Sequence, residues 1–140
     1  MKEKVRLIKL EKVNKKFKDF EINIDFEMFK GEIYGLIGKS GSGKSSILKI
    51  IQGLLKYDKG KIYKNDNLEI SYVFQEFNLL NNKTVFENVA LPLRLRGKFE
   101  KNKVNEAIKF VGLENRKEMY ISSLSGGEKQ RVGIARAIVS

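Results

Sequence analysis

The chain has 140 residues, 41% hydrophobic and 32% charged, a balance typical of a globular protein long enough for one hydrophobic core. It has no cysteine, which excludes disulfides and thiolate chemistry, and no apolar stretch reaches the ~18–20 residues that span a bilayer. The formal net charge of +11 comes from basic residues spread along the chain, without tryptophan or the aromatic-basic interleaving that stacks bases. We therefore expect a solvated basic surface and no nucleic-acid partner, while a basic face beside acidic lipids stays open.

The first half of the chain predicts strands separated by tight turns. Residues 1–6 are not followed by a long apolar region, so no secretory signal is expected. Residues 5–13 and 22–26 are predicted strands, the second one half-buried because its apolar residues alternate with polar ones. The apolar run 33–37 lacks that alternation and predicts a strand covered on both faces. Residues 58–60 predict a turn, and residues 70–74 predict another strand.

Residues 38–45 fit the phosphate-binding pattern GxxxxGK(S/T) at every fixed position. Glycines let the backbone N–H groups approach phosphates, and the helix expected after the loop, with apolar residues at helical spacing from Ile47 to Leu55, adds its positive end. Lys44 is the expected charge for the β and γ phosphates, and Ser45 is the expected hydroxyl ligand for Mg²⁺. The alternative, a glycine-rich turn with a chance lysine, is disfavoured by the strand and helix on either side. The predicted phosphate-binding residues are Gly38, Lys39, Ser40, Gly41, Ser42, Gly43, Lys44, Ser45 and Ser46.

The second half of the chain predicts helices. Thr84 with Glu87 fits a capping box at the start of an apolar stripe, and Pro92 is expected to end or kink that helix. A second stripe runs over residues 104–111, with Gly112 as its expected C-terminal cap. A mainly helical insert is therefore expected over residues 78–123.

A second motif, LSGGEKQR, occupies residues 124–131. Ser125, Gly126 and Gly127 open a helix with an apolar side, and free amides with a hydroxyl at a helix N-terminus form an anion site. Taken alone, the motif also fits an ordinary helix cap. Its occurrence with a phosphate loop in the same chain favours the anion site.

With these two motifs the chain resembles the ATP-binding subunit of an ATP-binding cassette (ABC) transporter. Two further elements are similar to that family: Phe17 where an aromatic stacks on adenine, and Gln75 at a strand end like the Q-loop glutamine. A core aromatic and a polar strand-end residue are the alternative interpretations. The resemblance implies an α/β P-loop NTPase fold of the ABC ATPase type, with an N-terminal antiparallel β part, a helical insert and an incomplete central sheet. The expected division is a nucleotide-binding core (1–77), a helical subdomain (78–123) and the signature helix (124–140).

The resemblance also implies a mechanism. Two subunits would pack head to tail around two ATP molecules, each held by the phosphate loop of one subunit and capped by Ser125, Gly126 and Gly127 of the other. The implied catalytic residues are Lys44, Gln75 and Ser125, the implied Mg²⁺ ligands are Ser45 and Gln75, and the implied cofactors are ATP and Mg²⁺. The implied partners are a second ATP-binding subunit and transmembrane permease subunits. The implied location is cytoplasmic, at the inner face of the cell membrane.

The sequence also departs from the family pattern. The family continues past the position of Ser140 with a strand bearing an Asp and a Glu and then a histidine, and this chain has no histidine. We therefore expect the 140-residue chain alone to hydrolyse ATP poorly or not at all. The segment 61–69 is short for the family. Residues 73–76 and 87–93 resemble transporters with separately encoded ATPases, with the lipoprotein-release and antimicrobial-peptide export group as one match.

Two alternatives remain at this stage. One is a non-catalytic nucleotide-binding fragment or regulatory half-cassette. The other is an ABC-type ATPase of DNA maintenance or translation. Lys44 and Ser125 are 81 positions apart with no heptad run between them, which disfavours the chromosome-organising type with its long coiled coils.

Overall fold

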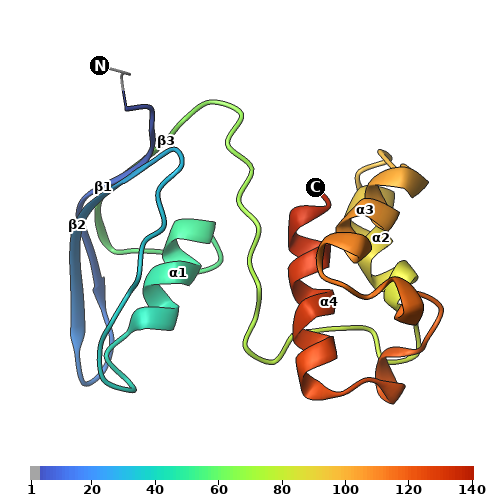
Figure 1. The fold of residues 1–140 in the computed structure, drawn as a ribbon. Coiled ribbons are helices and arrows are strands. Elements are labelled where there is room, and N and C mark those ends of the chain that lie inside the picture. The colour runs from blue at the N-terminus through green and yellow to red at the C-terminus, as the bar shows by residue number, and fades with distance from the viewer. Residues whose placement is uncertain (1–3) are drawn as a thin grey trace. The chain divides into compact units, whose positions relative to one another are not determined.

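The computed structural model describes residues 4–140, which form two compact units that divide between residues 70 and 71 (Figure 1). The first unit holds strands β1 (Arg6–Lys16), β2 (Glu21–Phe29) and β3 (Lys59–Lys64) and helix α1 (Lys44–Gln52). The second unit holds helices α2 (Val85–Leu95), α3 (Lys101–Phe110) and α4 (Gly126–Ile138). It also contains two short 3-10 turns, η1 (Glu114–Arg116) and η2 (Ile121–Ser123). Each unit has its own hydrophobic core.

The three strands form an antiparallel sheet in the order β2-β1-β3. Leu10 in the central strand pairs with Phe26 on one side and Ile62 on the other. Alternation puts Ile8 and Leu10 of β1 into the core, where they pack with Ile50 of α1. The expected N-terminal antiparallel part is therefore confirmed, with α1 on one face of the sheet.

The strands predicted at 33–37 and 70–74 are not present as strands, so those two predictions were wrong. Ile33 and Ile37 are 100% and 95% exposed, the opposite of the burial that their apolar sequence predicted. A buried strand needs neighbouring strands to satisfy its backbone groups, and no strand among residues 4–140 pairs with either segment. The family resemblance implied an incomplete central sheet. In agreement with this, residues 33–37 and 70–74 pair with no strand of the described structure.

β3 is a strand that the sequence did not reveal. The prediction at residues 58–60 was a turn, but the strand begins at Lys59. Its six residues include three lysines, and only Ile62 is partly buried. Lysines at the edge of a sheet discourage pairing with other chains, and they also remove the alternation by which strands are recognised.

In the second unit, α2, α3 and α4 enclose one core (Figure 1). Val89 of α2, Ile108 of α3 and Val132 of α4 are each at most 1% exposed. The helix stripes predicted from the sequence are therefore confirmed. Gly112, with φ +70°, lies just past α3 and donates its N–H to the Lys109 carbonyl, as its predicted capping role requires.

Helix α2 begins with the predicted capping box and continues through Pro92 to Leu95. The helix therefore does not end at Pro92, which was one of the two predicted effects, and a kink there stays a prediction. Proline removes one backbone donor and costs about 3 kcal/mol in a helix interior. Burial of Val89, Ala90 and Leu93 in the core offsets that cost. No helix among the described residues is long and apolar enough to cross a membrane.

Candidate nucleotide-binding site

The phosphate loop forms an exposed turn that runs directly into α1. Gly41 and Gly43 have φ +78° and +94°, a region that side-chain-bearing residues rarely adopt, and α1 begins at Lys44. The Ser42 N–H donates to the Lys39 carbonyl at 3.1 Å and closes the turn. The free N–H groups of the first helical turn therefore follow the loop without a gap, as an anion site requires.

Gly43 is also fixed by its neighbours in β2 and the preceding hairpin turn. A Cβ atom at this position would lie 2.6 Å from Cδ1 of Ile22 and 3.2 Å from Cε2 of Phe20. Real Cβ atoms essentially never come within 3.0 Å of another heavy atom, so only glycine fits without movement. The loop is thus seated against the start of β2.

The Lys44 side chain folds back over the loop. Its Nζ donates to the carbonyl oxygens of Gly38 and Lys39, both at 2.7 Å, and lies 3.4 Å from Oγ of Ser42. An ammonium has three donors, and phosphate oxygens accept stronger, charge-assisted bonds than carbonyls do. The lysine therefore stands where it can exchange carbonyl partners for phosphate partners.

Phe17 belongs to an aromatic pair beside this loop. Its ring stacks on Phe20 with centroids 4.5 Å apart and planes 9° apart, and its N–H donates to the Phe20 carbonyl at 2.8 Å. Phe17 is half-buried and Phe20 is 40% exposed, which argues against Phe17 as a core aromatic. Sequence reasoning missed Phe20, although its position across the hairpin turn from Phe17 was the available signal. The pair offers a flat face next to Gly43, as a nucleobase platform needs.

Ser125 caps α4 through a complete capping box. Its Oγ accepts from the Glu128 N–H at 3.2 Å, and its own N–H donates to the Glu128 carboxylate at 2.9 Å. The Ser125 N–H lowers the pKa of Glu128, and the ion pair with Arg116 at 3.2 Å adds to this. Gly126 and Gly127 are exposed, with open space where a Cβ would be. The Ser125 hydroxyl and the two glycines thus lie exposed at the start of α4, with the Glu128 carboxylate beside them.

Gln75 lies in an exposed turn, closed by the Phe77 N–H donating to the Phe74 carbonyl at 3.0 Å. The backbone of this turn is held by Arg136, eleven residues along α4 from Ser125. That number of helical residues spans about 16 Å. Within the second unit the structure therefore does not bring Gln75 and Ser125 into one site. The predicted residues divide between the units, with Phe17 and residues 38–46 in the first.

The predicted Mg²⁺ ligands fit that ion by their chemistry. Ser45 is exposed in the first turn of α1, and Gln75 is exposed in its turn. Mg²⁺ keeps several waters and takes one or two protein oxygens together with substrate phosphates. No group of three or more carboxylate, histidine or cysteine side chains that could hold a metal occurs in the described part of the chain. Ser45 and Gln75 each offer one oxygen of the kind that Mg²⁺ takes, and their assignment as its ligands stays a prediction.

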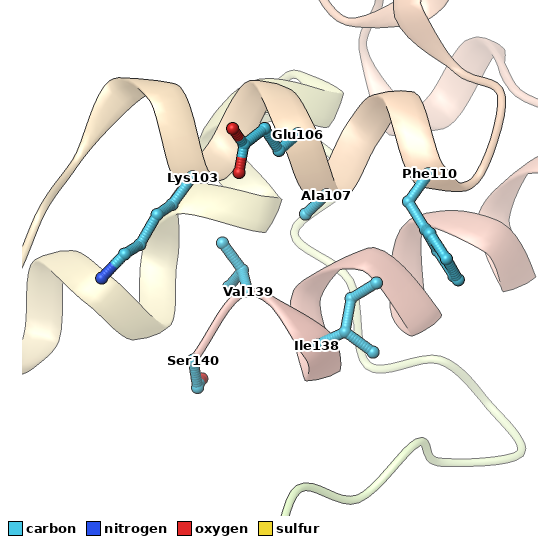
Figure 2. A pocket seen from close by; sticks show the side chains of 7 residues that line it. All are labelled: Lys103, Glu106, Ala107, Phe110, Ile138, Val139 and Ser140. Carbon is cyan, nitrogen blue, oxygen red and sulfur yellow. The ribbon is translucent and has the colours of Figure 1, made fainter.

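A hollow of about 380 Å³ lies between α3 and the end of α4 (Figure 2). None of the predicted nucleotide-binding residues lines it. Its lining combines apolar side chains with one acid and one base: Lys103, Glu106, Ala107, Phe110, Ile138, Val139 and Ser140.

A glycine-rich loop leading into the N-terminus of a helix defines the class of P-loop nucleotide-binding proteins. Residues 22–140 match the family described as ABC transporter, and the chain belongs to that family as an ATP-binding subunit. The resemblance and the fold class inferred from the sequence are confirmed.

Curated relatives and solved structures agree with this assignment. The methionine import ATP-binding protein of Clostridium tetani (strain Massachusetts / E88) is 42% identical over 151 residues, which cover 94% of this chain and 48% of the relative. That of Acinetobacter baylyi (strain ATCC 33305 / BD413 / ADP1) is 48% identical over 134 residues, covering 84% and 38%. The chain thus spans less than half the length of these relatives.

Among solved structures, a metal-chelate-type ABC transporter in an inward-facing conformation has a TM-score of 0.83 and 25% identity, covering 96% of this chain and 56% of that one. A dimeric bacterial ABC transporter cassette has a TM-score of 0.79 and 34% identity, covering 95% and 69%. The described fold therefore corresponds to a part of an ABC cassette.

Proposed function

We propose that this chain binds MgATP as part of an ABC ATPase subunit that powers transport across a membrane. The observation that carries the proposal is the phosphate loop, whose left-handed glycines lead directly into α1 and whose Lys44 ammonium rests on carbonyls of the same loop. The base stacks on Phe17, with Phe20 behind it. The phosphates lie on residues 38–46, and Ser45 and Gln75 hold Mg²⁺ with the remaining positions filled by phosphate and water.

The second part of the proposal is a site shared by two subunits. Ser125, Gly126 and Gly127 cap the nucleotide held by the phosphate loop of a partner subunit, since they form an exposed anion site of their own at the start of α4. The turn that carries Gln75 is bonded to Arg136 near the end of α4, whereas Ser125 lies at the start of that helix. One subunit therefore offers two separate contact points, which supports a site shared by two subunits. Closure of the pair is stabilised by charge-assisted hydrogen bonds to the γ-phosphate, and Lys44, Gln75 and Ser125 carry the catalytic contacts.

The third part concerns partners and location. We assign residues 1–77 to nucleotide binding, 78–123 to a helical subdomain that contacts transmembrane permease subunits, and 124–140 to the signature helix. The subunit then works at the cytoplasmic face of the cell membrane. The names of the C. tetani and A. baylyi relatives favour methionine as the imported substrate of the complex.

Binding of ATP to a Lys44→Ala variant tests the proposal. Because the variant loses a charged contact to the phosphates, we expect its affinity for MgATP to fall about 10- to 100-fold, measured by titration calorimetry. Lys49→Ala is the matched control, since Lys49 is an exposed lysine in the last turn of the same helix. Equal affinities for wild type and Lys44→Ala would show that the loop is not the phosphate site.

A further inference from the structure

The turn that carries Gln75 is hydrogen-bonded to the Arg136 side chain of α4. The Arg136 guanidinium donates to the carbonyl oxygen of Phe77 at 2.7 Å and to that of Asn78 at 2.8 Å. These partners are 59 and 58 positions away in the sequence. A planar guanidinium with a fixed fork of donors fits two successive carbonyls, whereas an ammonium does not reproduce that geometry.

The backbone at these two carbonyls has an uncommon conformation. Phe77 and Asn78 have φ +57° and +45°, in the left-handed region that residues with a side chain adopt at a cost. For a bulky residue such as Phe77 this conformation persists only where the surroundings hold it. The two bonds from Arg136 are contacts of that kind, and they lie two and three residues after Gln75.

Further contacts hold the segment on both sides of the turn. Before it, a Cβ built on Gly133 of α4 would lie 3.5 Å from Cγ1 of Val73, so the Val73 side chain runs over the same helix three residues before Arg136. After it, the Leu80 N–H donates to Oδ1 of the fully buried Asn88 at 2.8 Å, and Nδ2 of Asn88 donates back to the Leu80 carbonyl at 3.1 Å. Gln75 is therefore the exposed tip of a segment whose two ends are fixed.

We propose that Arg136 is a positioning residue for Gln75, linking the helix that starts at the signature motif to the turn that presents the glutamine. The inference rests on the proposed function, because it gives Gln75 a contact to Mg²⁺ and nucleotide. Arg136 touches neither ligand. It fixes the backbone conformation from which the Gln75 side chain extends, so that a displacement of α4 moves the turn with it.

A double-mutant cycle in the full chain tests this link. The probes are MgATP and, with EDTA present, ATP without metal. We expect Gln75→Ala to weaken binding of MgATP about fivefold and to leave binding of metal-free ATP unchanged. Arg136→Ala should produce the same pattern. The double variant should be no weaker than Gln75→Ala alone, because Arg136 acts only through Gln75.

Two further variants make the test specific. Arg136→Lys keeps the charge but loses the fork, and should fall between wild type and Arg136→Ala. Arg131→Ala is the control, because Arg131 lies on the same helix and donates to the Val111 carbonyl at 3.3 Å, away from the Gln75 turn. In hydrogen exchange, amides 77–80 should exchange about tenfold faster in Arg136→Ala than in wild type, and at the wild-type rate in Arg131→Ala.

The outcomes separate this inference from the proposed function. Additive losses in the cycle, or an equal loss with and without Mg²⁺, would show that Arg136 supports the fold generally and would overturn the inference. Unchanged exchange at 77–80 would overturn it as well, and so would a Gln75→Ala variant with wild-type affinity for MgATP. In each case loss of binding in Lys44→Ala would leave the proposed nucleotide site intact.

Discussion

Ser125 and Thr84 perform the same local task in the second unit. Each accepts a hydrogen bond from the N–H three residues on, and each donates its own N–H to the glutamate at that position. The surroundings differ, because Thr84 also bridges Tyr120 in a short β contact, whereas Ser125 is followed by two exposed glycines. The motif explains the cap in both helices, and the exposed glycines distinguish the Ser125 cap, where we propose an anion site, from the Thr84 cap.

This pair gives a matched experiment on the signature motif. Ser125→Ala and Thr84→Ala should each lower the free energy of unfolding by about 1 kcal/mol through loss of the cap. Only Ser125→Ala should weaken ATP-dependent pairing of subunits, measured by light scattering, and both variants should bind ATP as monomers with wild-type affinity. If Ser125→Ala lost monomer binding as Lys44→Ala does, a site shared by two subunits would be wrong.

Residues with local signals were predictable, and residues with distant partners were not. Thr84 and Ser125 lie three positions from the glutamates that complete their capping boxes. The sequence predicted the box of Thr84 with Glu87 and gave a helix cap as one interpretation of Ser125. The loop 38–45 was recognisable for the same reason. Arg136 contacts carbonyls 58 and 59 positions away, and backbone acceptors leave no residue-type signature. Nothing in the sequence indicates that contact.

At the scale of elements, the helices were predicted better than the strands. A helix satisfies its backbone within one segment, so the stripes at α2 and α3 and the cap at Gly112 sufficed. A strand depends on a neighbour, and the apolar run 33–37 has none among the described residues. The apolar composition of the run predicted burial, but without a pairing strand Ile33 and Ile37 are exposed. The lysine-rich β3 is the opposite case. It pairs with β1, but its sequence lacks the alternation of apolar and polar residues that predicts a strand.

The core of the second unit depends on one buried polar residue. Asn88 is 0% exposed and makes three hydrogen bonds, two with Leu80 and one to the Thr84 carbonyl at 2.9 Å. Asn88→Leu leaves the Leu80 backbone groups without partners and should lower the free energy of unfolding by about 2–3 kcal/mol in urea titrations.

A second asparagine in the same unit serves as the control. The Oδ1 of Asn105, on α3, is buried and has no hydrogen-bond partner within the structure of residues 4–140. Asn105→Leu should therefore change the free energy of unfolding by no more than about 0.5 kcal/mol, or raise it. Equal losses for the two variants would mean that side-chain volume, and not hydrogen bonding to Leu80, explains the effect of Asn88.

At the scale of the whole chain, the described residues supply contacts for binding but few groups for activating water. There is no histidine in the sequence, and no cluster of three acidic side chains occurs in the part that the structure describes. A polypeptide of these 140 residues, tested alone, is expected to release phosphate from ATP slowly or not at all, followed in a coupled phosphate assay. Sustained release that disappears in Lys44→Ala would contradict this expectation.

The exposed run that contains Ile33 and Ile37 affects how the protein behaves in solution. An uncovered β-prone segment is a template on which other copies add strands, and the rate of such addition rises with protein concentration. The net charge of +11 opposes this by keeping copies apart, but salt screens that repulsion over about 10 Å at 0.1 M. We therefore expect a preparation of the 140-residue polypeptide to stay dispersed at low ionic strength and to precipitate more readily as salt is added, because repulsion weakens while the apolar attraction does not.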